Sequence, residues 1–165
     1  MRSMVPATHM GRHEIRVETK VHATPIRVYQ ILSDAEKTVR WLPNVSDVKV
    51  TNKKTGVGAK RTVAMRMGNT ELVSHQRVVS AEPGKRYAWV HDQDFVDREK
   101  FDLLTDVGTV FELAPVGRRT RVTATAHFEP KGLSARLAAP FFTHDVKKQM
   151  NAALENIKRL AEIKD

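Results

Sequence analysis

The C-terminal segment from Gly132 to Lys164 reads GLSARLAAPFFTHDVKKQMNAALENIKRLAEIK. In its second half, apolar residues recur at spacings of three and four, which is typical of a helix with one buried face. These residues are Val146, Met150, Leu154, Ile157 and Ala161. Charged and amide side chains fill the positions between them, so the pattern predicts a long amphipathic helix that covers an apolar surface formed by the rest of the chain.

Pro140 interrupts the first half of this segment. Three apolar residues extend the pattern toward the N-terminus with i,i+4 spacing: Leu133, Leu137 and Phe141. Because proline lacks an amide proton and clashes with the preceding turn, we expect a short helix to about Ala139, a break, and then the long helix. Thr143 is expected to cap the long helix, with His144 and Asp145 in its first turn.

The preceding part of the chain has mostly the alternation of β-strands. In residues 13–23, apolar side chains alternate with charged ones, which indicates a half-buried antiparallel strand. Thr24 and Pro25 then have the cap and first-position chemistry of a helix start, and two short helices are expected up to Trp41. About six strands follow as far as Glu129. Helices gathered on one face of an antiparallel sheet make an α+β domain, and a curved sheet closed by one helix encloses space.

The composition is that of one globular domain. The chain has 165 residues, 41% of them hydrophobic and 28% charged. Residues 1–12 have little periodicity and are expected to be a tail, either disordered or derived from cloning, ahead of a single domain at 13–165. No apolar run approaches the roughly 18 residues of a membrane span, and no signal-peptide pattern is present. A cytoplasmic location is therefore expected. The absence of cysteine excludes disulfides and thiolate chemistry.

The net charge is +9, from 28 Lys and Arg against 19 Asp and Glu. The basic residues come in scattered pairs rather than blocks: Lys53-Lys54, Arg118-Arg119 and Lys147-Lys148. No nucleic-acid recognition motif accompanies them, so a solvated basic surface is favoured and no nucleic acid is expected as a partner. A basic interaction module stays open as an alternative, and it predicts binding that weakens steeply with salt.

Several short motifs, in order, resemble a known family. They are IRVET at 15–19 leading into ATP at 23–25, VYQILSD at 28–34, WLP at 41–43, VSAEPGKRY at 79–87, FEL at 111–113, TRVT at 120–123, and the helix end at 154–162. The chain resembles the helix-grip superfamily, also called START-like, Bet v 1-like or SRPBCC. Within it, the chain is most similar to the polyketide cyclase/dehydrase and lipid-transport family.

The resemblance implies a curved antiparallel sheet of about six or seven strands wrapped around a long C-terminal helix, with two short helices after the first strand. It also implies a small hydrophobic ligand, such as a lipid, a quinone or a polyketide-like aromatic, bound between the sheet and that helix. An enzyme of the cyclase/dehydrase type that uses the same cavity is the alternative. The matching motifs are structural rather than catalytic, and a fold does not fix a function. No cofactor is implied, and both monomer and homodimer stay open.

Strand alternation selects the side chains expected to line the cavity, because alternate residues of a strand share a face. The predicted ligand-binding residues are Arg61, Val63, Met65, Ser74, Gln76, Trp89, His91, Phe111, Leu137, Phe141, Asp145 and Met150.

Two of these residues are weak catalytic candidates. His91 follows Trp89 by two residues, and an imidazole beside an aromatic wall suits proton transfer to a flat ligand, as in an aldol-type cyclisation. The alternative is a core tryptophan and a histidine satisfied by the protein. Arg61 stands on an otherwise apolar strand face, where a ligand carboxylate or phosphate would supply the partner that a buried arginine needs. In the alternative interpretation, the strand is shifted and Arg61 reaches solvent.

The segment from His91 to Asp106 carries six acidic residues and is expected to be a solvated loop, which would form a gate over the cavity. It lacks the calcium-loop pattern, so no metal is predicted. The histidines do not have zinc-protease spacing, and no nucleophile elbow, phosphate-binding loop or dinucleotide fingerprint is present. The sequence therefore shows no recognisable catalytic constellation, and the question of enzymatic activity stays open.

Overall fold

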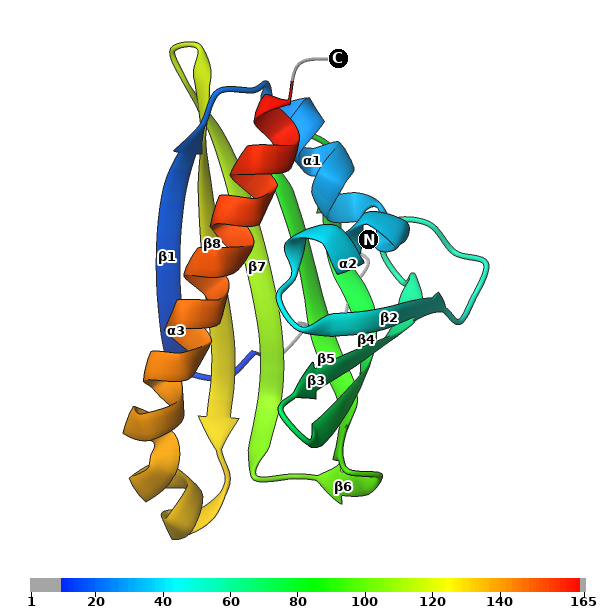
Figure 1. The fold of residues 1–165 in the computed structure, drawn as a ribbon, viewed down its shortest axis with the longest axis vertical. Coiled ribbons are helices and arrows are strands. Elements are labelled where there is room, and N and C mark those ends of the chain that lie inside the picture. The colour runs from blue at the N-terminus through cyan, green and yellow to red at the C-terminus, as the bar shows by residue number, and fades with distance from the viewer. Residues whose placement is uncertain (1–9, 164–165) are drawn as a thin grey trace, which may run out of the picture.

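The computed structural model describes residues 10–163, except for the side chain of Phe141. One curved antiparallel sheet has the strand order β1-β8-β7-β5-β4-β3-β2, with the short β6 paired to β5 (Figure 1). The elements are β1 His13–Val21, α1 Pro25–Ser33, the 3-10 turn Ala35–Lys37, α2 Thr38–Trp41, β2 Val45–Val50, β3 Lys60–Met67, β4 Thr70–Glu82, β5 Arg86–Val96, β6 Glu99–Phe101, β7 Leu104–Val116, β8 Arg119–Pro130 and α3 Gly132–Glu162. The predicted helix-grip fold is confirmed.

The first strand and helix form as their sequences predict. In β1, Ile15, Val17 and Val21 are buried, while the charged residues between them face outward. The strand pairs with β8, so that Ile15 lies opposite Ala126. The hydroxyl of Thr24 accepts a hydrogen bond from the Arg27 amide at 3.3 Å and caps α1. The buried side of α1 then packs against α3 and the sheet, which closes this end of the fold.

The predicted apolar stripe of α3 is confirmed from Val146 to Ala161, but the predicted break at Pro140 is wrong, because α3 is continuous from Gly132 to Glu162. Proline removes its own amide donor and crowds the carbonyl of Arg136, but Arg136 is an exposed residue, so water can solvate the carbonyl that loses this partner. Thr143 does not cap a second helix; its hydroxyl instead donates to the Ala139 carbonyl at 2.7 Å within α3.

The prediction that Leu137 faces inward is also wrong. Leu137 is 68% exposed and Leu133 is 73% exposed. Leu137 precedes Val146 by nine residues, about two and a half helical turns, so it stands on the opposite side of the helix. The buried positions in phase with Val146 are the small residues Ala135 and Ala139. The N-terminal half of α3 therefore turns small side chains toward the sheet.

The acidic segment is not the expected loop. β5 continues to Val96, and a tight turn joins it to β6 at Glu99. The two turn residues, Asp97 and Arg98, have positive φ angles of 48° and 71°, which is the left-handed geometry that a two-residue hairpin requires. The hairpin is hard to predict from the sequence, because this segment is rich in charged residues. Phe95 is one of its few apolar residues, so the alternation that indicates a strand is weak.

The core is densest at the end of the fold that holds α1 and α2. The fully buried Trp41 of α2 meets Phe111 of β7 edge to face, with ring centroids 5.6 Å apart, and Trp89 of β5 at 6.3 Å. Leu154 and Ile157 of α3 belong to the same core cluster. These side chains pack under the C-terminal half of α3, and the apolar cavity described below lies under its N-terminal half.

Candidate functional site

An inner cavity of about 490 Å³ lies under the N-terminal half of α3. Its wall is almost entirely apolar and comes from β3, β4, β5, the segment around β6 and α3. The lining residues are Met65, Leu72, Val73, Ser74, His91, Asp94, Phe95, Val96, Phe101, Leu103, Leu104, Ala135, Ala138 and Phe142. The volume falls in the range of roughly 300–1,000 Å³ typical of small-molecule sites. The two alanines leave this space open because they have almost no side chain to fill it.

Three polar side chains interrupt the apolar wall. Ser74 on β4 lies opposite Asp94 on β5, and its Oγ is 2.9 Å from Nδ1 of His91, which is also on β5. The same Nδ1 lies 2.9 Å and 3.2 Å from the two carboxylate oxygens of Asp94. The polar group thus presents one hydroxyl, one imidazole and one carboxylate to an otherwise apolar space.

The charge of Asp94 determines which nitrogen of His91 carries the proton. Burial by itself raises the pKa of Asp94, but hydrogen bonds from His91 and Ser74 and the nearby histidines outweigh burial and hold that pKa below its ordinary value. Asp94 is therefore an anion at neutral pH, and it accepts the Nδ1–H of His91. Nε2 is left as the nitrogen that can take up or release a proton, which is how a carboxylate orients a catalytic histidine.

We expect the free energy of unfolding of the Asp94→Asn variant to fall less between neutral and acidic pH than that of the wild type. A carboxylate whose folded pKa is depressed stabilises the fold above its unfolded pKa, about 3.9, and this stabilisation is lost as the pH falls through the folded value. Chemical denaturation between about pH 3 and pH 7 should therefore show a smaller loss of unfolding free energy for the variant than for the wild type. Equal slopes would contradict the assigned pairing, and Asp102→Asn, an exposed carboxylate, is the matched control.

A buried arginine extends the polar group into the core. Gln76 donates from Nε2 to Ser74 Oγ at 3.3 Å, and its Oε1 accepts from Arg61 Nε at 2.9 Å. Arg61 is only 4% exposed, so its side chain does not reach solvent. Its Nη1 donates to the Thr38 hydroxyl at 3.3 Å, and its guanidinium lies 4.6 Å from the centre of the Trp89 ring.

The Arg61 guanidinium is incompletely paired. Within residues 10–163, no carboxylate forms an ion pair with it, and its buried Nη2 has no hydrogen-bond partner. Burial lowers the pKa of Arg61, but arginine stays protonated at neutral pH. The site therefore holds a buried positive charge that only neutral dipoles and an aromatic face stabilise.

The structure divides the predicted ligand-binding residues into four groups. Met65, Ser74 and His91 line the inner cavity, and Arg61 and Gln76 join it through hydrogen bonds. Val63, Trp89 and Phe111 are buried core residues, and Met150 packs against that core. Leu137 and Asp145 are exposed, so their predicted inward position is wrong. The side chain of Phe141 lies outside the described residues.

Sequence reasoning missed Asp94, Phe142 and the alanines of α3. Asp94 was not selected because its segment was expected to be a solvated acidic loop. It nevertheless follows His91 by only three residues, which was a signal that the two side chains could meet. Counting back from Ile157 in steps of about 3.6 residues would have reached Phe142 and Ala135, and would have excluded Leu137.

Comparison with family models now identifies the family. Residues 12–162 match the model described as polyketide cyclase / dehydrase and lipid transport. The chain belongs to this family. The predicted membership of the SRPBCC, or START-like, superfamily is therefore confirmed. A comparison with curated proteins gives no match.

Solved structures share the fold at low sequence identity. An aromatase/cyclase, Zhui from a Streptomyces species, has a TM-score of 0.76 at 14% identity, over 91% of this chain and 93% of that one. A START superfamily protein from Mycobacterium smegmatis has a TM-score of 0.71 at 14% identity, over 91% and 97%. The di-domain aromatase/cyclase StfQ of the steffimycin pathway has a TM-score of 0.75 at 14% identity, over 90% of this chain and 50% of that one. This family member thus shares its fold with cyclases and START proteins alike.

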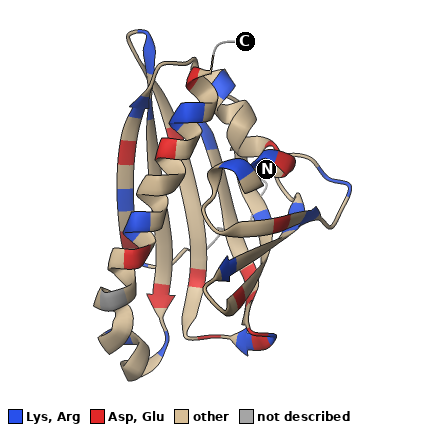
Figure 2. Cartoon of the chain, viewed as in Figure 1, with Lys and Arg blue, Asp and Glu red and all other residues tan. Residues whose placement is uncertain are grey.

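The charges of this family member are mixed over its surface. Figure 2 shows basic and acidic residues interspersed along α3 and along β1. In β1 they alternate as Glu14, Arg16, Glu18 and Lys20. No helix within residues 10–163 is both long and apolar enough to cross a membrane.

Proposed function

We propose that this family member binds a small hydrophobic molecule in the inner cavity. The observation that carries the proposal is the cavity itself, about 490 Å³ of space with an almost wholly apolar wall. When an apolar ligand covers apolar surface of this kind, binding is favoured by roughly 25 cal/mol for each Å² removed from water. Ser74 and His91 supply the few polar contacts that orient a ligand in such a site. Lipids, quinones and polyketide-like aromatics all fit this chemistry.

Native mass spectrometry of the purified protein, followed by solvent extraction, tests the proposal. A discrete added mass that leaves on extraction would support binding and would name the ligand class. If the protein carries no added mass, a thermal-shift screen of aromatic, quinone and fatty compounds provides the second test, because a ligand that binds only the folded state must raise the melting temperature. A clean mass together with no shift for any compound would overturn the proposal.

Filling the cavity gives a sharper version of the same test. Ala135 is buried against the cavity, so Ala135→Phe should place a ring in the ligand space and lower affinity at least tenfold. Ala152→Phe, on an exposed position of the same helix, is the matched control and should bind normally. Circular dichroism of both variants would separate a filled cavity from a misfolded chain. Unchanged affinity in a folded Ala135→Phe protein would place the ligand elsewhere.

A cyclase/dehydrase activity is the second candidate, and the His91–Asp94 pair favours it. A carboxylate that holds Nδ1–H leaves Nε2 available to accept a proton from a ligand carbon or to return it to a leaving hydroxyl. Both steps are needed when a poly-ketone chain closes a ring and loses water. His91→Gln keeps much of the side-chain volume but cannot shuttle a proton near neutral pH. It should abolish turnover of a poly-ketone substrate while leaving binding within a fewfold, whereas unchanged turnover would exclude His91 as the acid/base.

A further inference from the structure

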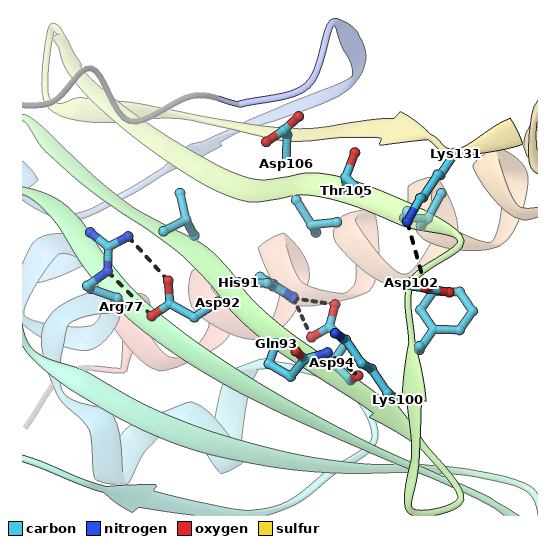
Figure 3. Close-up of a pocket in the computed structure, with 14 residues that line it drawn as sticks. Arg77, His91, Asp92, Gln93, Asp94, Lys100, Asp102, Thr105, Asp106 and Lys131 are labelled. Atoms are coloured by element: carbon cyan, nitrogen blue, oxygen red, sulfur yellow. Dashed lines mark hydrogen bonds and ion pairs between the residues drawn. The ribbon is translucent and has the colours of Figure 1, made fainter.

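The sheet has a window between β5 and β7. The two strands pair from Arg86 to Val90 on β5, but beyond Val90 no register pair joins them in the described part of the chain. On the edge away from β4, β5 pairs again only at residues 94–96, and there with β6, among the residues described. Residues 91–93 and 102–107 therefore lie along two segments that no register pair joins, and the pairing of β5 with β6 ends this stretch. We call this unpaired stretch the window; Figure 3 shows the side chains that lie along it.

Irregular pairing on both sides of the window explains why it stays open. The β4–β5 register shifts between His75 and Gln76, next to His91. The β7–β8 register shifts between Thr105 and Gly108. Extra residues of this kind bend a strand and redirect its side chains, and they are common beside functional sites. The β4–β5 bulge lies where His91 meets Ser74, so the same irregularity shapes both the window and the polar group.

A second, outer cavity of about 530 Å³ lies over the window. Unlike the inner cavity it is strongly polar, with seven charged side chains in its lining: Arg77, Asp92, Asp94, Lys100, Asp102, Asp106 and Lys131. Figure 3 shows them around the gap between the two strands. The outer and inner cavities share four lining residues, His91, Asp94, Phe101 and Leu104. One apolar space and one polar space therefore meet at the His91–Asp94 pair.

We propose that the ligand is an amphiphile that occupies both cavities, with its apolar part inside and a hydroxylated, uncharged head group in the outer cavity. This inference rests on the proposed function and adds the chemistry of the head group. A purely apolar ligand would leave the outer cavity to water and would give no use to a window through the sheet. An amphiphile matches both walls, because each part of it meets side chains of its own polarity.

The pairing of the outer charges is the reason for an uncharged head. Arg77 meets Asp92 at 3.2 Å, Lys131 meets Asp102 at 3.8 Å, and His91 meets Asp94 at 2.9 Å. With Lys100 and Asp106, the lining holds three cations and four carboxylates, so a charged head group of either sign would lie beside like charges as well as opposite ones. Hydroxyl groups can donate to the carboxylates and accept from the cations without breaking any pair. The carboxylates are also not gathered into a group of three or more that could hold a metal, among the residues described.

Three probes, each with ten carbons in its aliphatic part and each with a different head, test the proposal: decyl maltoside, decanoate and decanol. Each is titrated below its micelle concentration and measured by calorimetry. We expect decyl maltoside to bind at least tenfold more tightly than the other two. Thr105 lines only the outer cavity, so Thr105→Trp should remove this preference and leave decanol binding within twofold. Thr51→Trp, the same exchange at an exposed residue that lines neither cavity, is the control.

Asp102→Ala provides a second variant, at an exposed position where folding is not at risk. It should weaken decyl maltoside severalfold and leave decanol unchanged. Equal affinity for all three probes, or maltoside binding that neither variant weakens, would overturn the two-cavity inference and leave the proposed function standing. No binding of any probe, decanol included, would overturn this inference as well, and the mass-spectrometry and thermal-shift tests would then decide the proposed function separately.

Discussion

Replacing Trp41 with alanine should lower the free energy of unfolding by about 3–5 kcal/mol, the usual cost of truncating a large buried aromatic residue. Trp41 is fully buried where α2, the sheet and α3 meet. Its ring contacts Phe111 and Trp89, and its carbonyl accepts a hydrogen bond from the Asn156 side chain of α3 at 3.1 Å.

Two further variants separate packing from hydrogen bonding. The indole Nε1 is buried and has no hydrogen-bond partner within residues 10–163, so Trp41→Phe removes an unpaired donor and keeps most of the ring. Its loss should be well below that of alanine. Val39→Ala, on the same helix but 45% exposed, should stay within about 0.5 kcal/mol. Urea unfolding of the three variants gives the comparison, and a loss of less than about 1 kcal/mol for Trp41→Ala would contradict the assigned core.

The elements with a regular hydrophobic period could be predicted from the sequence. β1 and the part of α3 from Val146 to Ala161 each bury one face. A buried face requires apolar residues at the period of the strand or helix, and this period can be recognised in the sequence. The α1 start was equally readable, because Thr24 and Pro25 have side-chain chemistry specific to that position. The order of these elements then matched the family, and this was enough to predict the architecture.

The site was only partly predictable, because it depends on irregularities. Strand alternation correctly placed Ser74 and His91 on the inner face, but their contact with Asp94 depends on a bulge and on a hairpin turn with two positive φ angles. Asp97 and Arg98 give no strong turn signal. In α3, the sequence suggested a break at Pro140 and an inward Leu137, and the continuous helix overturned both. Local pattern therefore found three residues of the cavity wall, Met65, Ser74 and His91, but not the rest of the wall or the unpaired stretch beside it.

The buried charge of Arg61 leads to the second large effect, which is clearest in a double-mutant cycle with Gln76. Gln76→Leu removes the acceptor of Arg61 Nε and leaves the guanidinium buried with fewer partners. A hydrogen bond to a charged group contributes about 1.5–3 kcal/mol, so we expect a loss of that size in the free energy of unfolding. Arg61→Met removes the desolvated charge itself but leaves the buried Gln76 Oε1 without its donor, so we expect a loss of about 1–3 kcal/mol for this single variant as well.

The double variant Arg61→Met/Gln76→Leu should be at least as stable as the wild type, because exchanging a buried polar pair for apolar residues of similar shape is often neutral or stabilising, by up to about 4 kcal/mol. If the double variant loses much less unfolding free energy than the two single variants together, the wild-type pair contributes little or nothing to stability. A group kept under such conditions is expected to serve the ligand rather than the fold. The double variant should therefore fold well yet bind the ligand found by mass spectrometry or thermal shift more weakly than the wild type does. Additive losses, or full ligand retention, would instead make Arg61 a structural residue of the core.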